Sequence, residues 1–357
     1  MSENILDQLM PGEAIYPRNQ WYVAGYSDEL DEGPLARTLL DTPVVMYRTE
    51  KGEPAALFDR CPHRGIQLSR GKVVNDRMQC PYHGMEFNTE GVCKKIPSSA
   101  VIPDRMKVDS YPLVDSWHYL WIWMGDPDKA DENLIPDLSV WGFQQQGWYS
   151  RGALLLPTPG NYLMPFENFL DASHISFLHG GQLDQGNVAF VPFTTEIEGN
   201  WVKVHREIAR EKQSALTIKV FGFSGEYARR EIIAECYVPS MCGIRVNLTP
   251  LNEALDQPAG ETMTNQLAIG ITPETRSSCH QFTAVSQNFP FPVGIADNNK
   301  GLRDLLMQDV VAMENIQQTF DRIKPEERVE FSVKADEPAM RARRMIAKMI
   351  EDERKES

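Results

Sequence analysis

The sequence lacks an excess of positive charge, long apolar runs and a dense set of cysteines, and each absence excludes a class of function. Its 357 residues include 36 Lys and Arg against 50 Asp and Glu, a formal net charge of −14. Such a chain repels the phosphate backbone of nucleic acids, so nucleic acid is not an expected partner. No apolar run approaches the roughly 18 residues that span a bilayer, and the start of the chain lacks the basic and apolar regions of a signal peptide. We expect a cytoplasmic protein without membrane contact.

Six cysteines in a chain of this length are too few and too scattered for the disulfide framework of a secreted protein. Cys93, Cys236, Cys242 and Cys279 are not spaced like metal ligands, and we predict that they are buried small apolar residues. The sequence contains no repeat of roughly 20 to 50 residues, which excludes solenoids and propellers. Its composition, 42% apolar and 24% charged residues, is typical of ordinary globular domains.

The pattern of the sequence changes near residue 135 and predicts two domains. Between Trp21 and about Asp126, short runs rich in β-branched and aromatic residues alternate with Gly, Pro and Asp, which is typical of a small all-β unit. A polar connection with several helix and strand breakers follows at residues 125–133. We therefore predict an α+β protein with one domain at residues 1–135 and a second at residues 136–357.

The second domain is predicted to contain an antiparallel sheet and several helices. Runs of alternating polarity at residues 201–205, 216–221 and 281–285 predict strands of a half-buried sheet. A helix is predicted from Pro165 to about Leu178, with Gly180 and Gly181 after its end. Apolar residues at helical spacing predict a second helix over residues 301–322 and a final one before the charged end of the chain.

Two short loops of the first domain each combine one cysteine with one histidine. They are Cys61-Pro62-His63-Arg64-Gly65 and Cys80-Pro81-Tyr82-His83-Gly84. Two thiolates and two imidazoles on tight loops predict a metal site. A structural zinc ion is one interpretation, although zinc sites of this composition usually keep their two cysteines together. Mixed loops favour a Rieske-type [2Fe–2S] cluster, in which two cysteines bind one iron and two histidines bind the other.

A second group of ligand-type residues lies within residues 167–179. Asn168, Asp171 and His174 are spaced by three, so they share one face of the predicted helix. His179 follows five residues after His174, about 140° around an α-helix. Both histidines can bind one metal only if the helix widens to a π-type turn or unwinds within residues 174–179. Two neutral imidazoles and one carboxylate would form the facial triad of non-haem Fe(II) oxygenases.

Asp309 is the predicted carboxylate of this triad. It lies on an apolar stripe of the helix at 301–322, where an unpaired carboxylate would be costly and a metal would remove that cost. The stripe contains Leu302, Leu305, Leu306, Met313 and Ile316. Asp304 and Glu314 are alternatives on the same helix, but their spacing places them off the stripe.

Together the two groups of residues resemble the oxygenase (alpha) component of Rieske non-haem iron oxygenases over nearly the whole chain. The resemblance implies an all-β Rieske [2Fe–2S] domain followed by a helix-grip (START-like) catalytic domain with an antiparallel sheet. It also implies the ligands: Cys61, His63, Cys80 and His83 for the cluster, and His174, His179 and Asp309 for Fe(II), with Asn168 near the iron. Many members carry Trp where this chain has Met85, a difference in packing near the cluster.

Members of this family work as head-to-tail trimers, so the resemblance implies a homotrimer. It further implies that Asp171 joins His83 of an adjacent subunit to His174 and carries electrons between the two metal sites. The alternative interpretation of Asp171 is an acid in the first turn of a helix that stabilises the helix dipole.

Within the family, three segments are most similar to the monooxygenase group of dicamba O-demethylase, vanillate O-demethylase and toluenesulfonate methyl-monooxygenase. They are residues 19–24, 121–127 and 271–275. The similarity implies an enzyme that uses O2 to hydroxylate, or to O- or N-demethylate, a small aromatic substrate. Electrons would come from NAD(P)H through a ferredoxin or flavin reductase. Two alternatives stay open: an aromatic ring hydroxylase or dioxygenase that forms a phenol or a cis-diol, and a Rieske electron carrier fused to a non-catalytic ligand-binding domain.

Overall fold

The computed structural model describes residues 16–356 except 181, 184–187, 223–224, 253–256, 292–294 and 325–326; the side chains of 295–298 are also not described. The predicted helix-ending residue Gly181 and the first residues of the chain lie outside the described residues. The chain forms two compact units. One consists of Arg18–Ile135 with Thr272–Thr275, and the other is built mainly from Pro136–Ile271 and Arg276–Ser357. The predicted boundary between residues 135 and 136 did not anticipate that Thr272–Thr275 groups with the first unit, and it stays a prediction.

The first unit contains three small antiparallel sheets, as the alternation of short apolar runs and turn residues predicts. One sheet has the order β1 (Trp21–Tyr26), β11 (Tyr119–Trp123), β10 (Leu113–Ser116). A second has the order β2 (Leu35–Leu39), β3 (Thr42–Arg48), β4 (Pro54–Phe58), β9 (Ser110–Tyr111). The third has the order β5 (Lys72–Val74), β6 (Arg77–Gln79), β7 (Glu86–Phe87), β8 (Cys93–Lys95).

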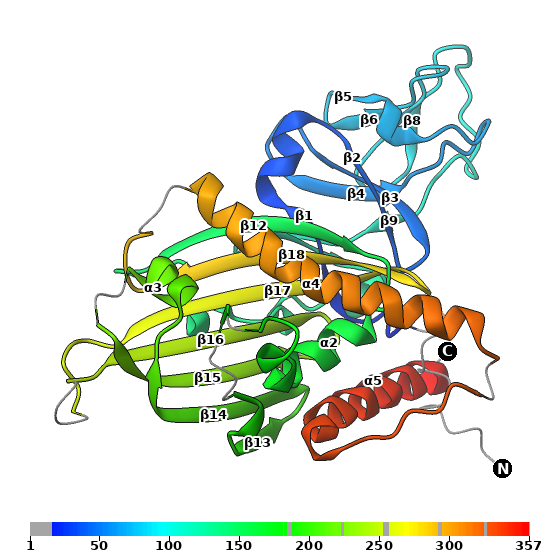
Figure 1. Ribbon diagram of the computed structural model, residues 1–357. Coiled ribbons are helices and arrows are strands. Elements are labelled where there is room, and N and C mark those ends of the chain that lie inside the picture. Colours follow the sequence, from blue (N-terminus) through cyan, green and yellow to red (C-terminus); the bar gives the residue numbers. More distant parts are fainter. Residues whose placement is uncertain are drawn as a thin grey trace. The chain divides into compact units, whose positions relative to one another are not determined.

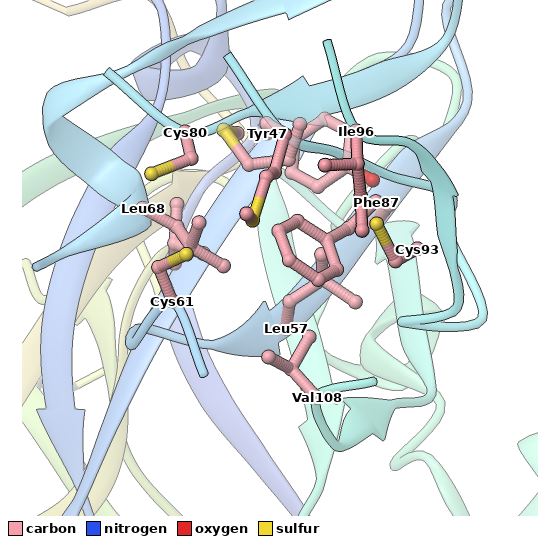
Figure 2. Packing of buried hydrophobic residues seen from close by; sticks show 13 residues of the cluster. Tyr47, Leu57, Cys61, Leu68, Cys80, Phe87, Cys93, Ile96 and Val108 are labelled. Atoms are coloured by element: carbon pink, nitrogen blue, oxygen red, sulfur yellow. The ribbon is translucent and has the colours of Figure 1, made fainter. Parts of the chain in front are cut away.

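Buried apolar residues of these strands form a core that includes the two cysteines of the cysteine–histidine loops. Tyr47, Leu57 and Phe87 are fully buried within it, and Cys61 and Cys80 are almost fully buried. Figure 2 shows the sulfur atoms of Cys61 and Cys80 at one side of this core, beside Leu68. The core therefore fixes the start of both loops.

The second unit is a seven-stranded antiparallel sheet with helices on one face. The strand order is β12 (Tyr149–Thr158), β18 (Ser278–Gln287), β17 (Met263–Thr275), β16 (Met241–Pro250), β15 (Tyr227–Tyr237), β14 (Trp201–Lys212), β13 (Phe193–Glu198). The long helix α4 (Ile295–Arg322) runs across the sheet and packs on β12. Helix α2 (Leu163–Leu170) packs on β15 and β16, and α5 (Glu337–Glu356) packs on α2 and β14 (Figure 1). The predicted α+β class is confirmed.

The predicted helix at 165–178 is wrong in its extent. Helix α2 ends at Leu170, and a 3₁₀ helix, η6 (Ala172–Ser176), follows. Asp171 interrupts the helix because its backbone is extended and its carboxylate accepts a hydrogen bond from the Ser173 amide. Short polar side chains compete in this way with the helix backbone. Asn168, Asp171 and His174 therefore do not share one α-helical face. Residues 174–179 form no π turn but are unwound into a 3₁₀ turn and irregular turns, which is the second of the two predicted irregularities.

The predicted strand at 216–221 is also wrong, because these residues form helix α3 (Ala215–Phe221). The Ser214 side chain accepts a hydrogen bond from the Thr217 amide and caps the start, and Gly222 ends the helix with a left-handed backbone, φ +64°. These two caps favour the helix over the β propensity of the residues between them. Ile316, assigned to the apolar stripe of α4, is exposed, whereas the neighbouring Gln317 is buried.

Two of the cysteines predicted to be simple buried apolar residues form a disulfide. Cys236 of β15 lies directly opposite Cys242 of β16, and their sulfur atoms are bonded. Both residues are fully buried, and Cys93 and Cys279 are buried and are not part of a disulfide. Spacing in the sequence could not predict the pairing, because it depends on strand register. Among the described helices, none combines the length and apolar character that crossing a bilayer requires.

Candidate metal centres and substrate cavity

The two cysteine–histidine loops have the same backbone structure. In each loop the cysteine amide donates to the carbonyl five residues later, and the glycine amide donates back to the cysteine carbonyl, at 2.8–3.1 Å. Gly65 and Gly84 have left-handed backbones, φ +80° and +66°, a conformation that glycine adopts at little cost. The chain therefore presents two matching turns, each with one sulfur and one imidazole.

The four side chains of these loops separate into a buried pair and an accessible pair. The thiols of Cys61 and Cys80 are buried and contact each other, and burial raises the pKa of Cys61 to about 11. His63 is partly exposed and His83 is exposed, and their Nδ1 atoms face each other at 3.2 Å. Two adjacent buried thiols would be hard to ionise without a metal, and metal binding displaces their protons. The donor set fits a cluster held by two sulfurs on one side and two nitrogens on the other.

In the second unit, the structure brings His174, His179 and Asp309 together. One ligand atom from each lies within 4.8 Å of the others. Nε2 of His174 is 3.5 Å from Asp309 Oδ1, and Nε2 of His179 is 3.3 Å from the same oxygen. Such separations are those of neighbouring ligands around one ion with bonds of about 2.1 Å. The turns after Leu170 make this possible, because η6 carries His174 and the turns at residues 177–180 carry His179.

Hydrogen bonds orient each of these three side chains. His174 donates from Nδ1 to the main-chain oxygen of Asp171 at 2.5 Å, and His179 donates from Nδ1 to Gln308 Oε1 at 3.1 Å. Both Nε2 atoms are thus left to face Asp309, the arrangement by which outer partners set the tautomer of a metal-binding histidine. Asn168 donates to Asp309 Oδ1 at 3.0 Å. Burial lowers the pKa of His174, although the charge of Asp309 opposes the shift. The neutral imidazole that a metal requires is favoured.

Comparisons with known proteins agree with both sites. Residues 20–112 match the Rieske [2Fe–2S] domain, and residues 159–352 match the vanillate O-demethylase oxygenase C-terminal domain. The chain is 31% identical to the oxygenase component of dicamba O-demethylase from Stenotrophomonas maltophilia, over 94% of this chain and 98% of the relative. It is 27% identical to the vanillate O-demethylase oxygenase subunit of a Pseudomonas species, over 94% and 95% of the two chains. A crystal structure of dicamba monooxygenase with 3,6-dichlorosalicylic acid superposes with a TM-score of 0.86, at 29% identity over 95% and 99%.

The chain belongs to the Rieske non-haem iron oxygenases. It is an oxidoreductase and the oxygenase component of a system that includes a separate reducing component. Its cofactors are a [2Fe–2S] cluster and mononuclear Fe(II), with NAD(P)H acting through the reductase. The predicted family, fold and cofactors are confirmed. The assignment of individual ligand residues rests on the geometry above and stays a prediction.

The oxygenase has a cavity of about 210 Å³ beside His174, His179 and Asp309. Sheet, α4 and α3 all contribute to its walls, and most of the lining is apolar: Phe169, Ile232, Leu267, Leu302, Leu306 and, from α3, Val220. A site of this kind excludes water from the reacting atoms and holds a ligand by shape. The cavity is smaller than the roughly 300 Å³ at which pockets for drug-sized ligands begin, so a single ring is the ligand size that it suits.

Asp171 of the oxygenase caps η6 within its own chain. Its carboxylate accepts hydrogen bonds from the Ser173 amide and hydroxyl at 2.9 and 2.7 Å. Arg206, whose side chain is buried, lies 3.8 Å from the same carboxylate. These contacts within one chain agree with the alternative interpretation, in which Asp171 is an acid that stabilises the start of a helix. The role between subunits requires a second chain and stays a prediction.

Sequence reasoning missed Gln308, which orients His179, and Arg151, which contributes a positive charge to the cavity lining. Gln308 directly precedes Asp309, and Arg151 lies in β12, but neither position carries a pattern that marks it. A third group, His205, Glu207 and Glu231, lies on β14 and β15, with ligand-type atoms within 4.8 Å of one another. Exposed acidic groups of this kind are common without a metal, and we assign them no role.

Proposed function

We propose that the chain removes a methyl group from oxygen or nitrogen of a small aromatic compound, or hydroxylates such a compound. The observation that carries the proposal is the triad of His174, His179 and Asp309 beside an apolar cavity of single-ring size. Iron held there supplies the reductive activation of dioxygen. The relatives named dicamba and vanillate O-demethylases support demethylation. Hydroxylation of a methyl carbon bound to oxygen or nitrogen gives a product that releases formaldehyde.

The residues of the chain have separate tasks in this proposal. Cys61, His63, Cys80 and His83 would hold the cluster, and His174, His179 and Asp309 would hold the iron. Asn168 keeps the Asp309 carboxylate in position through its amide hydrogen bond. The apolar cavity walls exclude water and hold the methyl group near the metal ligands, which lowers the entropy cost of reaching the reactive geometry.

We also propose that the oxygenase is a homotrimer in which Asp171 faces His83 of an adjacent subunit. Support comes from the exposure of His83 and from the Asp171 side chain, which is 23% exposed. The redox partner would be a ferredoxin or flavin reductase that takes electrons from NAD(P)H. We place the system in the cytoplasm, where NAD(P)H is available.

The test is coupled turnover of methoxylated and N-methylated aromatics with formaldehyde detection. We expect formaldehyde from at least one compound and its loss in His174→Ala, while the visible spectrum of the cluster is kept. His205→Ala is the matched control, because His205 lies outside the cavity lining, and it should retain turnover. A phenol or cis-diol without formaldehyde would indicate ring oxidation. Unchanged turnover in His174→Ala would indicate a non-catalytic second unit.

A further inference from the structure

The segment that carries both cysteine–histidine loops is positively charged, although the chain as a whole is acidic. Residues 59–109, between β4 and β9, contain 9 Lys and Arg against 6 Asp and Glu, a net charge of +3. Because the chain carries −14 in total, all other residues together carry −17. Such a local reversal of charge produces a field that a charged partner senses before contact.

Strand β8 and residues 105–107 lie side by side at the surface of this segment. Val92, just before β8, forms an antiparallel bridge with Lys107, and the Cys93 amide donates to the Met106 carbonyl at 3.1 Å. Cys93 is buried in the core of the cysteine–histidine loops (Figure 2), and Met106 packs against that core. The residues next to Cys93 and Met106 point away from the core, because neighbours in an extended chain alternate in direction.

Three of these outward residues are cations, Lys94, Arg105 and Lys107, which we call the basic patch. All three are exposed, and no carboxylate of the described residues lies within 4.0 Å of any of their charged groups. Val92, which pairs with Lys107, is 38% exposed. An accessible apolar residue beside charged ones is typical of protein interfaces. The positive charge of the patch is therefore available to a partner.

The basic patch lies next to the second cysteine–histidine loop. Strand β8 pairs with β7, which begins two residues after Gly84 of that loop. A Cβ atom added at Gly84 would lie 3.2 Å from Cγ of Pro97, so the turn of the loop lies against the chain that leaves β8. The patch shares no residue with His83, which the proposed trimer assigns to an adjacent subunit. A protein bound at the patch would thus lie close to the proposed cluster site through contacts of its own.

We propose that the basic patch is the docking surface for an acidic ferredoxin that delivers electrons to the cluster. The inference rests on the proposed function, since it states where the redox partner of that proposal binds and which charge it carries. One electron passes from the reduced ferredoxin to the oxidised cluster, and no covalent bond changes. Opposite charges speed the encounter of two proteins and orient them. Electron-transfer complexes bury little area, which suits a patch of three cations.

The experiment measures reduction of the cluster in the holoenzyme by a pre-reduced acidic plant-type [2Fe–2S] ferredoxin, by stopped-flow absorbance and without aromatic substrate. The second-order rate constant of the wild type should fall at least about tenfold between ionic strengths of about 0.01 M and about 0.5 M, because salt screens the attraction. Lys94→Glu/Lys107→Glu should lower the low-salt rate constant about thirtyfold and remove most of the salt dependence. Lys94→Gln/Lys107→Gln should lie between the two. Photoreduced riboflavin, a small neutral reductant, should reduce all three proteins equally.

The matched control is Arg229→Glu/Lys324→Glu, which makes the same change of net charge at exposed positions of the other compact unit. It should keep nearly the wild-type rate constant with ferredoxin. Equal slowing by both charge-reversed variants, or a wild-type rate constant that does not fall with salt, would overturn the docking site. A change in particle size of the patch variant, measured by light scattering, would make the patch a contact between copies of this chain and would also overturn it. If the charge-reversed variant does not fold, Lys94→Gln/Lys107→Gln and the wild-type salt dependence decide.

The proposed reaction is tested separately, because formaldehyde release driven by photoreduced riboflavin needs no ferredoxin. Formaldehyde from this assay, together with ferredoxin reduction that ignores the patch, would keep demethylation and remove the docking site. Patch-dependent reduction by ferredoxin without formaldehyde from any methoxylated or N-methylated aromatic would keep the docking site and remove the proposed reaction.

Discussion

At the residue scale, Asp309 is a buried carboxylate, and a bound metal ion would explain its burial. Its side chain is 5% exposed, and it accepts a hydrogen bond from Asn168 while facing two imidazole nitrogens. A neutral imidazole is a weak partner for a buried carboxylate, and a cation between the three groups satisfies all of them. The same reasoning does not apply to Asp304, which lies on the exposed side of α4.

The first prediction concerns Asp309→Asn, which keeps the shape of the side chain and removes its charge. We expect iron content to fall from about three per chain to about two, because the cluster keeps its two irons. Turnover should fall by more than the roughly 10- to 100-fold typical of removing an outer partner of a metal ligand. Iron analysis and the visible spectrum measure the two sites separately. Asp304→Asn on the same helix should retain three irons, and an equal loss in both variants would contradict the assignment.

Residue types and spacing singled out the four proposed cluster ligands, because a thiol and an imidazole on each of two similar loops indicate a metal site. They singled out His174 and His179 through an alignment with Asn168 and Asp171 on a continuous helix, which the structure does not form. Asp309 was predictable from its place on an apolar stripe. Gln308 and Arg151 were not predictable, since an amide or a guanidinium at one position is ordinary in any sequence. Their roles depend on which side chains the fold brings beside them, His179 for the first and Asn299 for the second.

At the element scale, the connection after α2 shows how a side chain can override a helical pattern. The apolar spacing of residues 165–178 suits a continuous helix, yet Asp171 ends it and starts a 3₁₀ turn. The same competition decided α3, where Ser214 and Gly222 are caps. Patterns of polarity identified which segments are buried, but capping hydrogen bonds decided whether those segments became helix or strand.

The second prediction concerns the link between α5 and α2. Arg343 of α5 is 7% exposed and binds both Glu167 of α2 and Glu330. Helix α2 carries Asn168, so this link also supports the proposed iron site. Arg343→Gln leaves the half-buried Glu167 carboxylate without its cation and should destabilise the unit by about 1–3 kcal/mol. Thermal unfolding measures the change. Arg341→Gln removes an exposed ion pair of the same helix and should cost at most about 0.5 kcal/mol. Equal effects of the two substitutions would contradict a stabilising link between α5 and α2.

The third prediction concerns pH and the strands around the cluster loops. Glu86 of β7 is 1% exposed and contacts Lys95 of β8 at 2.8 Å and Gln79 of β6 at 3.2 Å. Burial alone would raise the pKa of Glu86, but these hydrogen bonds and the charges of Lys95 and Arg77 outweigh it and lower the pKa below 4.5. The folded unit therefore keeps Glu86 ionised to a lower pH than the unfolded chain does. Its stabilisation is complete above pH 4.5 and is lost as the pH falls through the folded pKa.

The corresponding variant is Glu86→Gln. At neutral pH it should destabilise the unit by about 1–2 kcal/mol, a modest value because the Lys95 side chain is half exposed. The difference from the wild type should shrink below pH 4.5. The temperature at which the cluster absorbance is lost, followed across pH, measures the effect. Glu90→Gln, an exposed neighbour on the following turn, is the control. A difference that stays constant across pH would contradict the charge argument.

At the scale of the whole molecule, the chain holds its two proposed ligand sets in different compact units. The cluster set belongs to Arg18–Ile135 with Thr272–Thr275, and the iron set belongs to the other unit. Residue patterns predicted two domains, whereas transfer of electrons between chains was implied only by the resemblance to the family. The proposed transfer between chains requires both groups to be accessible, and the imidazole of His83 is exposed and the carboxylate of Asp171 partly exposed.

The fourth prediction tests this with mixed oligomers. His83→Ala and His174→Ala chains carry different affinity tags, are produced together, and are purified through both tags. Each variant alone should be inactive, because one lacks a complete cluster site and the other a complete iron site. If electrons pass between chains, mixed oligomers pair an intact cluster with an intact triad of a neighbour and should recover part of the wild-type turnover. Light scattering should give three chains per particle. Inactive mixed oligomers that retain both the cluster spectrum and the mononuclear iron would instead place transfer within one chain.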